Sequence, residues 1–468
     1  MESCLINELK KLKDSSKEAV ENVDQFGQFK EYMHVARRVQ EELVHIIKSA
    51  QQLTHKQLVL VCGSVGDGKS HLMSYLKNKM NILDGFYVHN DATESLTPNM
   101  TSIETLDEIL KGFRDEQLED GRNEKVIVAI NLGMLNNFID SENGKHYTKL
   151  KKYVEKSGIL ESYTNEQGFD GTSPFQHINF SDYHLYHLSK SGDHVGSEYI
   201  KSLIHKLINP VGENCFYTAY ESQCLSCKVS EECPVKQNYE ILKYDQVQDA
   251  LVDILVEAMM KHKIIISTRT LLSFFYDILV GKGFSKEKFI GMNYDERIKV
   301  YLESLLPNLL YGHSDTSEVL DKINENDPMS VRSESVDEII IKFNILDNCL
   351  SLMEECLHDN IYLSCFKNID LNRRCQENRY IKPLALKAFI RTYKLLGIEG
   401  KLDIADSIYN AYIDNLYYFN TSHIRQLKEL YTNLKEAIYK WNGDSSNKID
   451  RKSTRLNSSH LGISYAVF

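Results

Sequence analysis

The amino-acid sequence predicts an α/β fold in its first half and helical regions in its second half. Short apolar runs alternate with helical segments up to about residue 205, which is the pattern of strands joined by helical crossovers in a mostly parallel sheet. After about residue 244, apolar residues recur at helical spacing. A chain of 468 residues exceeds one small core, so we expect several domains.

The composition is that of a globular protein. Apolar residues make up 42% of the chain and charged residues 26%, which argues against disorder. No run approaches the roughly twenty apolar residues that cross a bilayer, and the N-terminal segment lacks the apolar centre of a signal peptide. We therefore expect a cytoplasmic protein without membrane contact. A net charge of −11 argues against a free-standing nucleic-acid binder, because such proteins usually carry basic surfaces.

Two helices are expected in the N-terminal region, residues 1–52. Within the stretch 5–52, apolar residues such as Val35, Val39 and Leu43 recur at the spacing of an amphipathic helix.

Four strands are expected in the following α/β core, residues 53–205. Each is a short apolar run that becomes polar at its carboxyl end, and a helix over about 102–118 separates the second run from the third. Ligands of parallel sheets bind at the carboxyl ends of the strands, so these polar residues are candidates for a site. The expected strands lie within 58–62, 85–95, 125–135 and 175–185.

A glycine-rich loop follows the first expected strand and precedes a helix. It fills the pattern G-x-x-x-x-G-K-[ST] in the context that supports it. Glycines allow backbone N–H groups to surround phosphate oxygens, and the helix N-terminus adds positive potential. We expect Lys69 to reach the β and γ phosphates of ATP and the Ser70 hydroxyl to bind Mg²⁺. The predicted nucleotide-binding residues are Gly63, Ser64, Val65, Gly66, Asp67, Gly68, Lys69, Ser70 and His71.

Hydrolysis of ATP also requires an acid near Mg²⁺ and a group that orients water. The third expected strand ends in Asn131, where an aspartate is expected. We interpret Asn131 as a polar sensor of the γ-phosphate. The candidate acids are Asp91, Glu94 and Asp182, and a turn or capping role is the alternative for each of these residues.

Arg269 lies in the first turn of a predicted helix, behind a Ser/Thr cap. An arginine at this end of a helix opposes the helix dipole, so another interaction is expected to hold it. We interpret Arg269 as a lid arginine that contacts the γ-phosphate, with a plain surface arginine as the alternative. The predicted fold is thus a P-loop NTPase of the ASCE or AAA-like type, with a helical lid over 244–321.

Four cysteines cluster in a predicted insertion, residues 206–243, with the spacing C-x8-C-x2-C-x5-C-P. They are Cys215, Cys224, Cys227 and Cys233. Disulfides are not expected in a cytoplasmic chain, whereas four thiolates at this spacing can bind one metal ion tetrahedrally. Zn²⁺ is the expected metal, and an iron–sulfur cluster is the alternative because proline follows the last cysteine. Cys349, Cys356, Cys365 and Cys375 lie on apolar helices and are expected in the core.

The remaining residues form a linker and a helical C-terminal region. The polar stretch 322–338 is the expected linker, and helices resume over 339–449. Residues 450–468 resemble the in-frame translation of a sequencing adapter, with the match running from Asp450 to His460. We exclude them from the fold and expect the natural chain to continue beyond about Ile449.

Segments spread over about residues 5–449 match one known family in order. They are "FKEYMHVARRVQEEL", "CGSVGDGKSHL", "HNDATES", "VIVAINLGMLNNF", "CLSCKVSEECPVKQNYE", "TRTLLSFFYDIL" and "IKPLALKAFIRTYKLLG". The sequence thereby resembles the DptF family of DNA phosphorothioation-dependent restriction proteins. The resemblance implies a bacterial ATPase subunit that acts with partner subunits on DNA lacking the phosphorothioate modification. DNA contact and cleavage are then expected from the partners or from sequence beyond this chain, rather than from a nuclease site here.

Three other functions are alternatives to an ATPase in a DNA-defence complex. The first is a switch-type signalling ATPase of another bacterial immune system, in which ATP binding rather than turnover matters. The second is a scaffold that nucleotide merely stabilises. The third, a small-molecule phosphotransferase, needs an arginine-rich lid, whereas the predicted lid offers Arg269 alone for this role.

Overall fold

The structure is a computed structural model that divides into two compact units, residues 1–187 with 195–405 and residues 188–194 with 406–468. The described residues are 4–17, 27–93, 99–160, 168–188, 195–312, 315–357, 361–367, 369, 371, 378–396 and 402–442. Glu94, Cys375 and the segment 450–468, each named in the sequence predictions, lie outside these residues.

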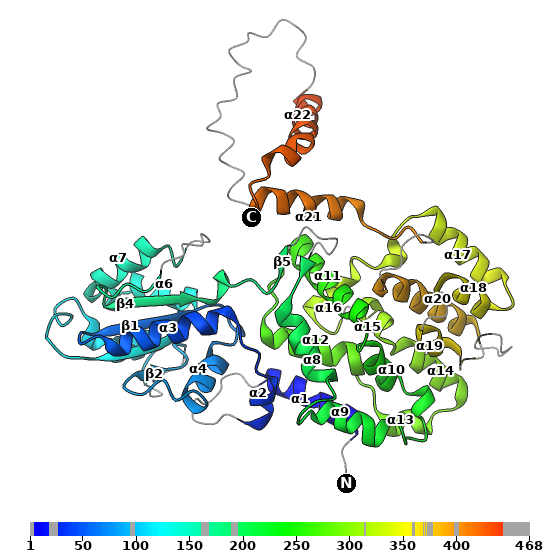
Figure 1. Cartoon of the computed structure of the whole chain (residues 1–468), viewed down its shortest axis with the longest axis horizontal. Helices are drawn as coiled ribbons and strands as arrows, with labels where there is room; N and C mark the ends of the chain where they lie inside the picture. Colours follow the sequence, from blue (N-terminus) through cyan, green and yellow to red (C-terminus); the bar gives the residue numbers. More distant parts are fainter. Residues whose placement is uncertain are drawn as a thin grey trace, which may run out of the picture. The chain divides into compact units, whose positions relative to one another are not determined.

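A parallel sheet of four strands forms the centre of the α/β region (Figure 1), in the order β2-β3-β1-β4. Every residue of β1 is buried, because it pairs with β3 on one side and β4 on the other. All four expected strands are confirmed. Their bounds are Gln57–Cys62 for β1, Tyr87–His89 for β2, Lys125–Ile130 for β3 and Phe175–Asn179 for β4.

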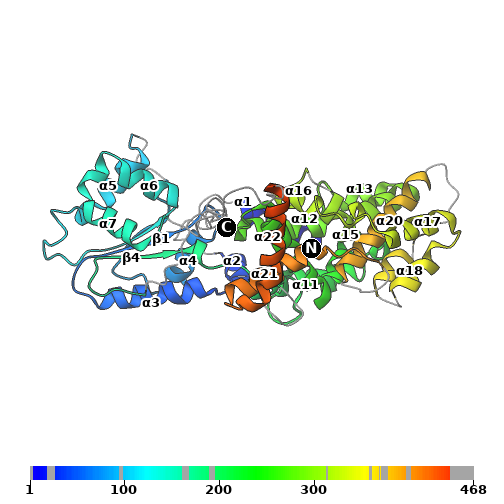
Figure 2. The ribbon, with the colours of Figure 1, turned by 90° about the horizontal axis from the view of Figure 1, so that it is seen from above.

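Helices cover both faces of the sheet (Figure 2), so β1 has no solvent-facing side. Alternate residues of β1 point to opposite faces: Leu58 and Leu60 pack on one face, and Val59 and Val61 on the other. The first face contacts α5 (Ser102–Ile109), α6 (Leu132–Asp140) and α7 (Thr148–Ser157), and the second contacts α3 (Arg38–Gln52) and α4 (Lys69–Asn78). Short helical turns η1 (Lys111–Phe113), η2 (Asn143–His146) and η3 (Phe180–Asp182) complete the region.

The N-terminal region differs from the two helices expected. It contains α1 (Leu5–Lys17) and α2 (Gln28–Met33) before α3, and residues 34–37 between α2 and α3 are not helical. Val35 therefore lies in an irregular segment, although its spacing suits a helix. Helix α1 packs against α12 (Thr268–Val280) through a fully buried leucine face, and Lys13 bonds the buried Asp277 of α12 at 2.9 Å. The leucines are Leu5, Leu9 and Leu12.

Helices follow the sheet, as the sequence predicts. Two short strands, β5 (His187–Leu188) and β6 (Val195–Gly196), precede them. Helix α8 (Glu198–Ile208) runs from the end of the expected core into the expected cysteine insertion. The expected insertion and lid then contain α9 (Cys215–Ala219), η4 (Tyr220–Cys224), η5 (Ser230–Glu232), α10 (Pro234–Ile241), α11 (Asp245–His262), α12, α13 (Lys286–Gly291), α14 (Tyr294–Glu303) and α15 (Leu306–Gly312).

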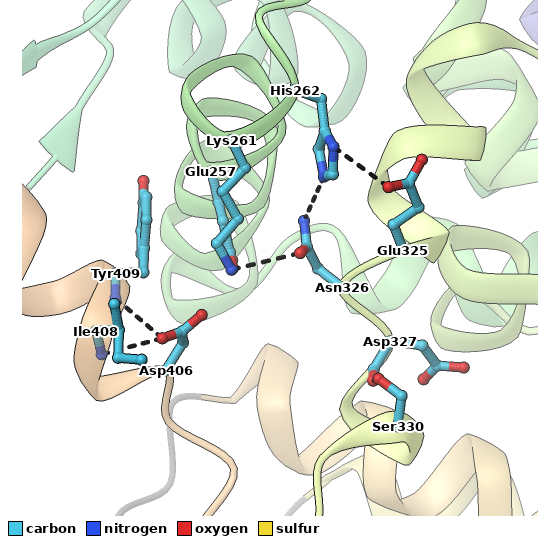
Figure 3. Close-up of polar contacts among 10 residues, drawn as sticks. All are labelled: Glu257, Lys261, His262, Glu325, Asn326, Asp327, Ser330, Asp406, Ile408 and Tyr409. Atoms are coloured by element: carbon cyan, nitrogen blue, oxygen red, sulfur yellow. Dashed lines mark hydrogen bonds and ion pairs between the residues drawn. The ribbon is translucent and has the colours of Figure 1, made fainter. Parts of the chain in front are cut away.

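The polar stretch 322–338 is not an open linker. It contains the end of α16, then η6 and the start of α17, and both Pro328 and Val336 are buried. Its polar side chains bond neighbouring helices: Asn326 accepts a hydrogen bond from Lys261 of α11 at 3.3 Å (Figure 3). The elements from here to residue 405 are α16 (Glu318–Asn324), η6 (Pro328–Ser330), α17 (Glu334–Ile345), α18 (Cys349–Leu357), η7 (Ile361–Leu363), α19 (Ser364–Lys367) and α20 (Asn378–Leu395).

A buried arginine of α20 joins three parts of this helical region. Arg391 is 5% exposed, and its Nε donates to Asp327 at 3.1 Å. Its other nitrogens donate to Asn308 Oδ1 at 2.7 Å and to the backbone oxygen of Tyr311 at 3.2 Å. Because a buried guanidinium needs charged and hydrogen-bonding partners, this network fixes α15, the turn before η6 and α20 against one another.

The second unit contains α21 (Ser407–Asn420), η8 (Ile424–Leu427) and α22 (Lys428–Asn442). Asp406 caps α21 by accepting the N–H groups of Ile408 and Tyr409 at 3.0 and 2.9 Å (Figure 3). In the described part of the chain, no helix is long and apolar enough to cross a membrane.

Replacement of Asp327 should destabilise the fold strongly. Asp327→Asn leaves the buried Arg391 without a negative partner, so we expect the free energy of unfolding to fall by about 3 kcal/mol. The control is Asp315→Asn, which breaks an exposed ion pair with Lys282 and should cost less than about 1 kcal/mol. Urea denaturation measures both, and equal losses would contradict the structural role of the buried pair.

Candidate functional site

The loop from Gly63 to Ser70, here called the glycine-rich loop, connects β1 to α4. Gly66 and Gly68 have φ angles of +88° and +93°, which residues with side chains rarely adopt. Gly68 is also the residue directly before α4, at the N-cap position, so its left-handed conformation sets the direction in which the helix leaves the loop. The backbone conformation therefore explains why glycine occupies these two positions.

The charged groups of the loop bond its own backbone. Lys69 Nζ donates to the backbone oxygens of Gly63 and Ser64 at 2.8 and 2.7 Å. The Ser64 N–H donates to Asp67 Oδ2 at 2.6 Å. Burial lowers the pKa of Lys69, and the negative charges of Asp67 and Asp91 oppose this shift. Burial also raises the pKa of Asp67, so both charges are held in a partly desolvated place.

A pocket of about 230 Å³ lies at the carboxyl end of the sheet. Lys69, Asp91, Asn131 and Arg269, the four residues predicted to act in catalysis, all line it. They come from the loop, from the segments after β2 and β3, and from α12. The loop residues that line the pocket are Val65, Gly66, Asp67, Gly68, Lys69 and Ser70, together with His71; Gly63 and Ser64 form the base of the loop and Asp182 is not among the lining residues.

Asp91 and Asn131 also have local structural roles. Asp91 Oδ1 accepts the N–H and the hydroxyl of Thr93 at 2.8 and 2.7 Å, which forms a turn. Asn131 Oδ1 accepts the Met134 N–H at 2.7 Å and so caps α6. Asp91 therefore stabilises a turn and Asn131 caps a helix, as the alternative interpretations expect. Both residues also line the pocket.

The first turn of α12 lies directly against the glycine-rich loop. Ser267 caps α12, and a Cβ added to Gly66 would lie 2.9 Å from Ser267 Oγ. Thr268 and Tyr199 are joined by a hydroxyl hydrogen bond of 2.9 Å. Because the first turn of α12 lies against the loop, Arg269 reaches the pocket although Arg269 is far from the loop in sequence.

Arg37 is a pocket residue that the sequence patterns did not reveal. It donates to the backbone oxygens of Asp67 and Tyr183 at 3.3 and 3.2 Å. Its guanidinium also lies over the rings of Phe180 and Tyr199, with 5.6 and 5.1 Å to the ring centres. The neighbouring Arg38 is exposed, and no spacing in the sequence distinguishes the two arginines.

Two histidines join the N-terminal segment to α4 at the pocket edge. His34 Nδ1 lies 3.0 Å from His71 Nε2, and its ring stacks on Tyr75 with centres 3.7 Å apart. Burial, with a contribution from His71, lowers the pKa of His34 to about 4. His34 is thus neutral at physiological pH, and one ring nitrogen donates to the other ring.

The cysteines of the expected insertion lie at different places. Cys224 ends η4, Cys227 follows in a turn, and Cys233 precedes α10, whereas Cys215 begins α9 beside Glu8 and Lys11 of α1. Over the described residues, no group of three or more His, Cys, Asp or Glu side chains is already arranged to hold a metal ion. Cys349, Cys356 and Cys365 are buried, as expected for core residues.

Comparisons of the sequence with models of known protein families and with curated proteins give no match.

Replacement of Gly66 should disturb the contact between the loop and α12. Gly66→Ala places a side chain at a φ of +88° and against Ser267. Gly85→Ala places one at a similar φ of +84°, with open space around it. We expect Gly66→Ala to lower the free energy of unfolding by about 1–3 kcal/mol more than Gly85→Ala does. Urea denaturation of the two variants gives this difference directly. Equal losses would show that the steric contact with α12 does not affect the free energy of unfolding.

Proposed function

We propose that the chain is a P-loop NTPase of the ASCE or AAA-like type that binds ATP with Mg²⁺ in this pocket and hydrolyses it. The observation that carries the proposal is that Lys69, Ser70, Asp91, Asn131 and Arg269 line one pocket. Phosphoryl transfer depends on positioning and on electrostatic stabilisation more than on covalent chemistry, so positive groups, a metal-binding acid and polar donors around one space are the required set.

Each residue has a role that fits its local bonds. Lys69 would exchange the loop carbonyls for the β and γ phosphates, and the Ser70 hydroxyl would bind Mg²⁺. Asp91 uses Oδ1 for its turn, so its second oxygen suits the Mg²⁺ hydration shell. Asn131 uses its oxygen as a helix cap, so its NH₂ group, a donor, would remain for the γ-phosphate or the attacking water. Arg269 would stabilise the negative charge of the transition state.

The apolar part of the pocket suits the nucleoside. Met33 and Val39 come from the N-terminal segment, Leu203 from α8 and Leu272 from α12, and all four line the same pocket as the loop. A purine ring has flat apolar faces, and ligand sites combine such apolar surfaces with few polar groups. Arg37 adds a third positive group between this surface and the loop.

We further propose that this ATPase works as a subunit of a DNA phosphorothioation-dependent restriction complex. The support is the resemblance of the sequence to the DptF family. The net charge of −11 agrees with a subunit whose DNA contact is supplied by partners. ATP binding and turnover would then change how the α/β region and the helical region engage those partners.

The Lys69→Ala variant tests ATP use. We expect phosphate release to fall at least ~100-fold, because a positive group beside the transferring phosphate is lost. Lys77→Ala is the matched control, since Lys77 lies in the exposed last turn of the same helix and should leave the rate unchanged. Stoichiometric ATP binding with negligible phosphate release by the wild-type chain would instead support the switch-type alternative. Full restriction of unmodified DNA in cells by an assembled Lys69→Ala complex would reject any role of ATP.

A pair of Asn131 variants separates catalysis from capping. Asn131→Ala removes both the cap and the amide donor, so stability should fall by about 1 kcal/mol and turnover should also fall. Asn131→Ser keeps a capping oxygen but lacks the amide donor, so turnover should fall while stability stays near that of the wild type. Phosphate release and urea denaturation are measured on both variants. If turnover follows stability instead, Asn131 acts only as a cap.

A further inference from the structure

Arg37 is the N-cap residue of α3, yet its side chain makes no capping bond there. Serine, threonine, asparagine and aspartate are the usual residues at this position, and a positive charge opposes the helix dipole. The side chain instead reaches two backbone oxygens outside α3: Nη1 donates to that of Asp67 and Nη2 to that of Tyr183. Arg37 therefore links the glycine-rich loop to the segment that follows β4.

Two aromatic rings fix the guanidinium of Arg37 further. Its Cζ lies 5.6 Å from the ring centre of Phe180 and 5.1 Å from that of Tyr199. Tyr199 is in turn held by its hydrogen bond to Thr268 in the first turn of α12. A planar guanidinium can bond two carbonyls and stack on rings at the same time, whereas the ammonium group of a lysine has no flat face and acts as a point charge. These contacts therefore require an arginine rather than any positive side chain.

The bond to the Asp67 oxygen fixes the peptide between Asp67 and Gly68. This peptide is trans and planar, so its carbonyl oxygen and its N–H point in opposite directions. Because the oxygen points to Arg37, the Gly68 N–H points away from Arg37. Gly68 has a φ of +93°, and glycine tolerates rotation of the preceding peptide better than any other residue does. A contact from outside the loop, here that of Arg37, therefore decides which way this N–H faces.

The Gly68 N–H belongs to the part of the loop that would bind phosphate. Gly68 lies directly before Lys69, at the N-cap position of α4. In loops of this sequence pattern, backbone N–H groups surround the α and β phosphates of the nucleotide. If the peptide were reversed, it would present the Asp67 carbonyl oxygen, which repels a phosphate, in place of a donor.

We propose that Arg37 is a positioning residue that turns the Gly68 N–H toward the β-phosphate of the bound nucleotide. This inference rests on the proposed function, because it assigns a residue that prepares the loop for ATP. Arg37 acts through the backbone of the loop and does not touch the reacting γ-phosphate. Its loss therefore weakens the binding of ADP and ATP alike. The rate of phosphoryl transfer at saturating ATP stays nearly unchanged, in contrast to the role proposed for Arg269.

Nucleotide binding by matched arginine variants tests this role. Titration calorimetry with Mg²⁺ and either ADP or a non-hydrolysable ATP analogue is carried out on the whole chain as wild type, Arg37→Ala, Arg37→Lys and Arg38→Ala. We expect the Kd for both ligands to rise at least ~10-fold in both Arg37 variants, which is the effect of losing one hydrogen bond to a charged group. Arg38→Ala is the control and should bind like the wild type, because Arg38 is exposed and bonds Glu42 of its own helix.

Other results of the same titrations would overturn the positioning role. A larger loss for the ATP analogue than for ADP, together with a lower kcat, would place Arg37 in direct contact with the γ-phosphate. Wild-type affinity in Arg37→Lys would show that the positive charge alone matters. Wild-type affinity in Arg37→Ala would show that the loop does not need this side chain.

A second measurement requires no nucleotide. Hydrogen exchange of the nucleotide-free chain, read by mass spectrometry, follows the N–H groups of Ser64 and Asp67, which bond Asp67 Oδ2 and the Ser64 oxygen. We expect exchange in residues 63–70 to be at least ~10-fold faster in Arg37→Ala and unchanged in Arg38→Ala, with exchange in β3 as the control for folding. Unchanged exchange in Arg37→Ala would overturn the positioning role. If the wild type binds no nucleotide but exchange changes as expected, the proposed function is rejected and the hold of Arg37 on the loop is supported.

Discussion

The close approach of Gly66 to Ser267 is the contact on which the geometry of the site depends. A hydrogen in place of a side chain at Gly66 allows the first turn of α12 to lie on the loop, and Arg269 then reaches the pocket that the loop borders. The position of α12 is also fixed by α1, which packs against it, whose leucines are fully buried and whose Lys13 bonds Asp277. The lack of a side chain at Gly66 thus determines how closely α12, and with it the helical region, packs against the loop at the end of the sheet.

The irregular segment between α2 and α3 makes the second important contribution. Because residues 34–37 leave helical conformation, His34 stacks on Tyr75 of α4, and Arg37 bonds the backbone of Asp67. The pocket is therefore built from three parts of the chain that are distant in sequence: the N-terminal segment, the sheet with its loop, and α12. None of the three would form the pocket alone.

Local patterns predicted the strands, the loop and the four candidate catalytic residues at the pocket. This was possible because hydrophobic alternation, glycine conformation and the carboxyl ends of parallel strands are local or topological properties. The place of Arg37 in the pocket and the packing of residues 322–338 were not predictable in this way. The polar composition of that stretch does not reveal that Asp327 meets a buried Arg391.

The carboxylate of Asp67 has a consequence for selectivity. It already occupies the Ser64 N–H, while Lys69 already occupies two loop carbonyls. An anion that enters the glycine-rich loop therefore exchanges bonds rather than adding them, and it must compete with a carboxylate that is tethered at high local concentration. Singly charged anions such as chloride have little advantage in this exchange. The proposed ligand, a polyphosphate with bound Mg²⁺, would offer several oxygens at once and would therefore be favoured over singly charged anions.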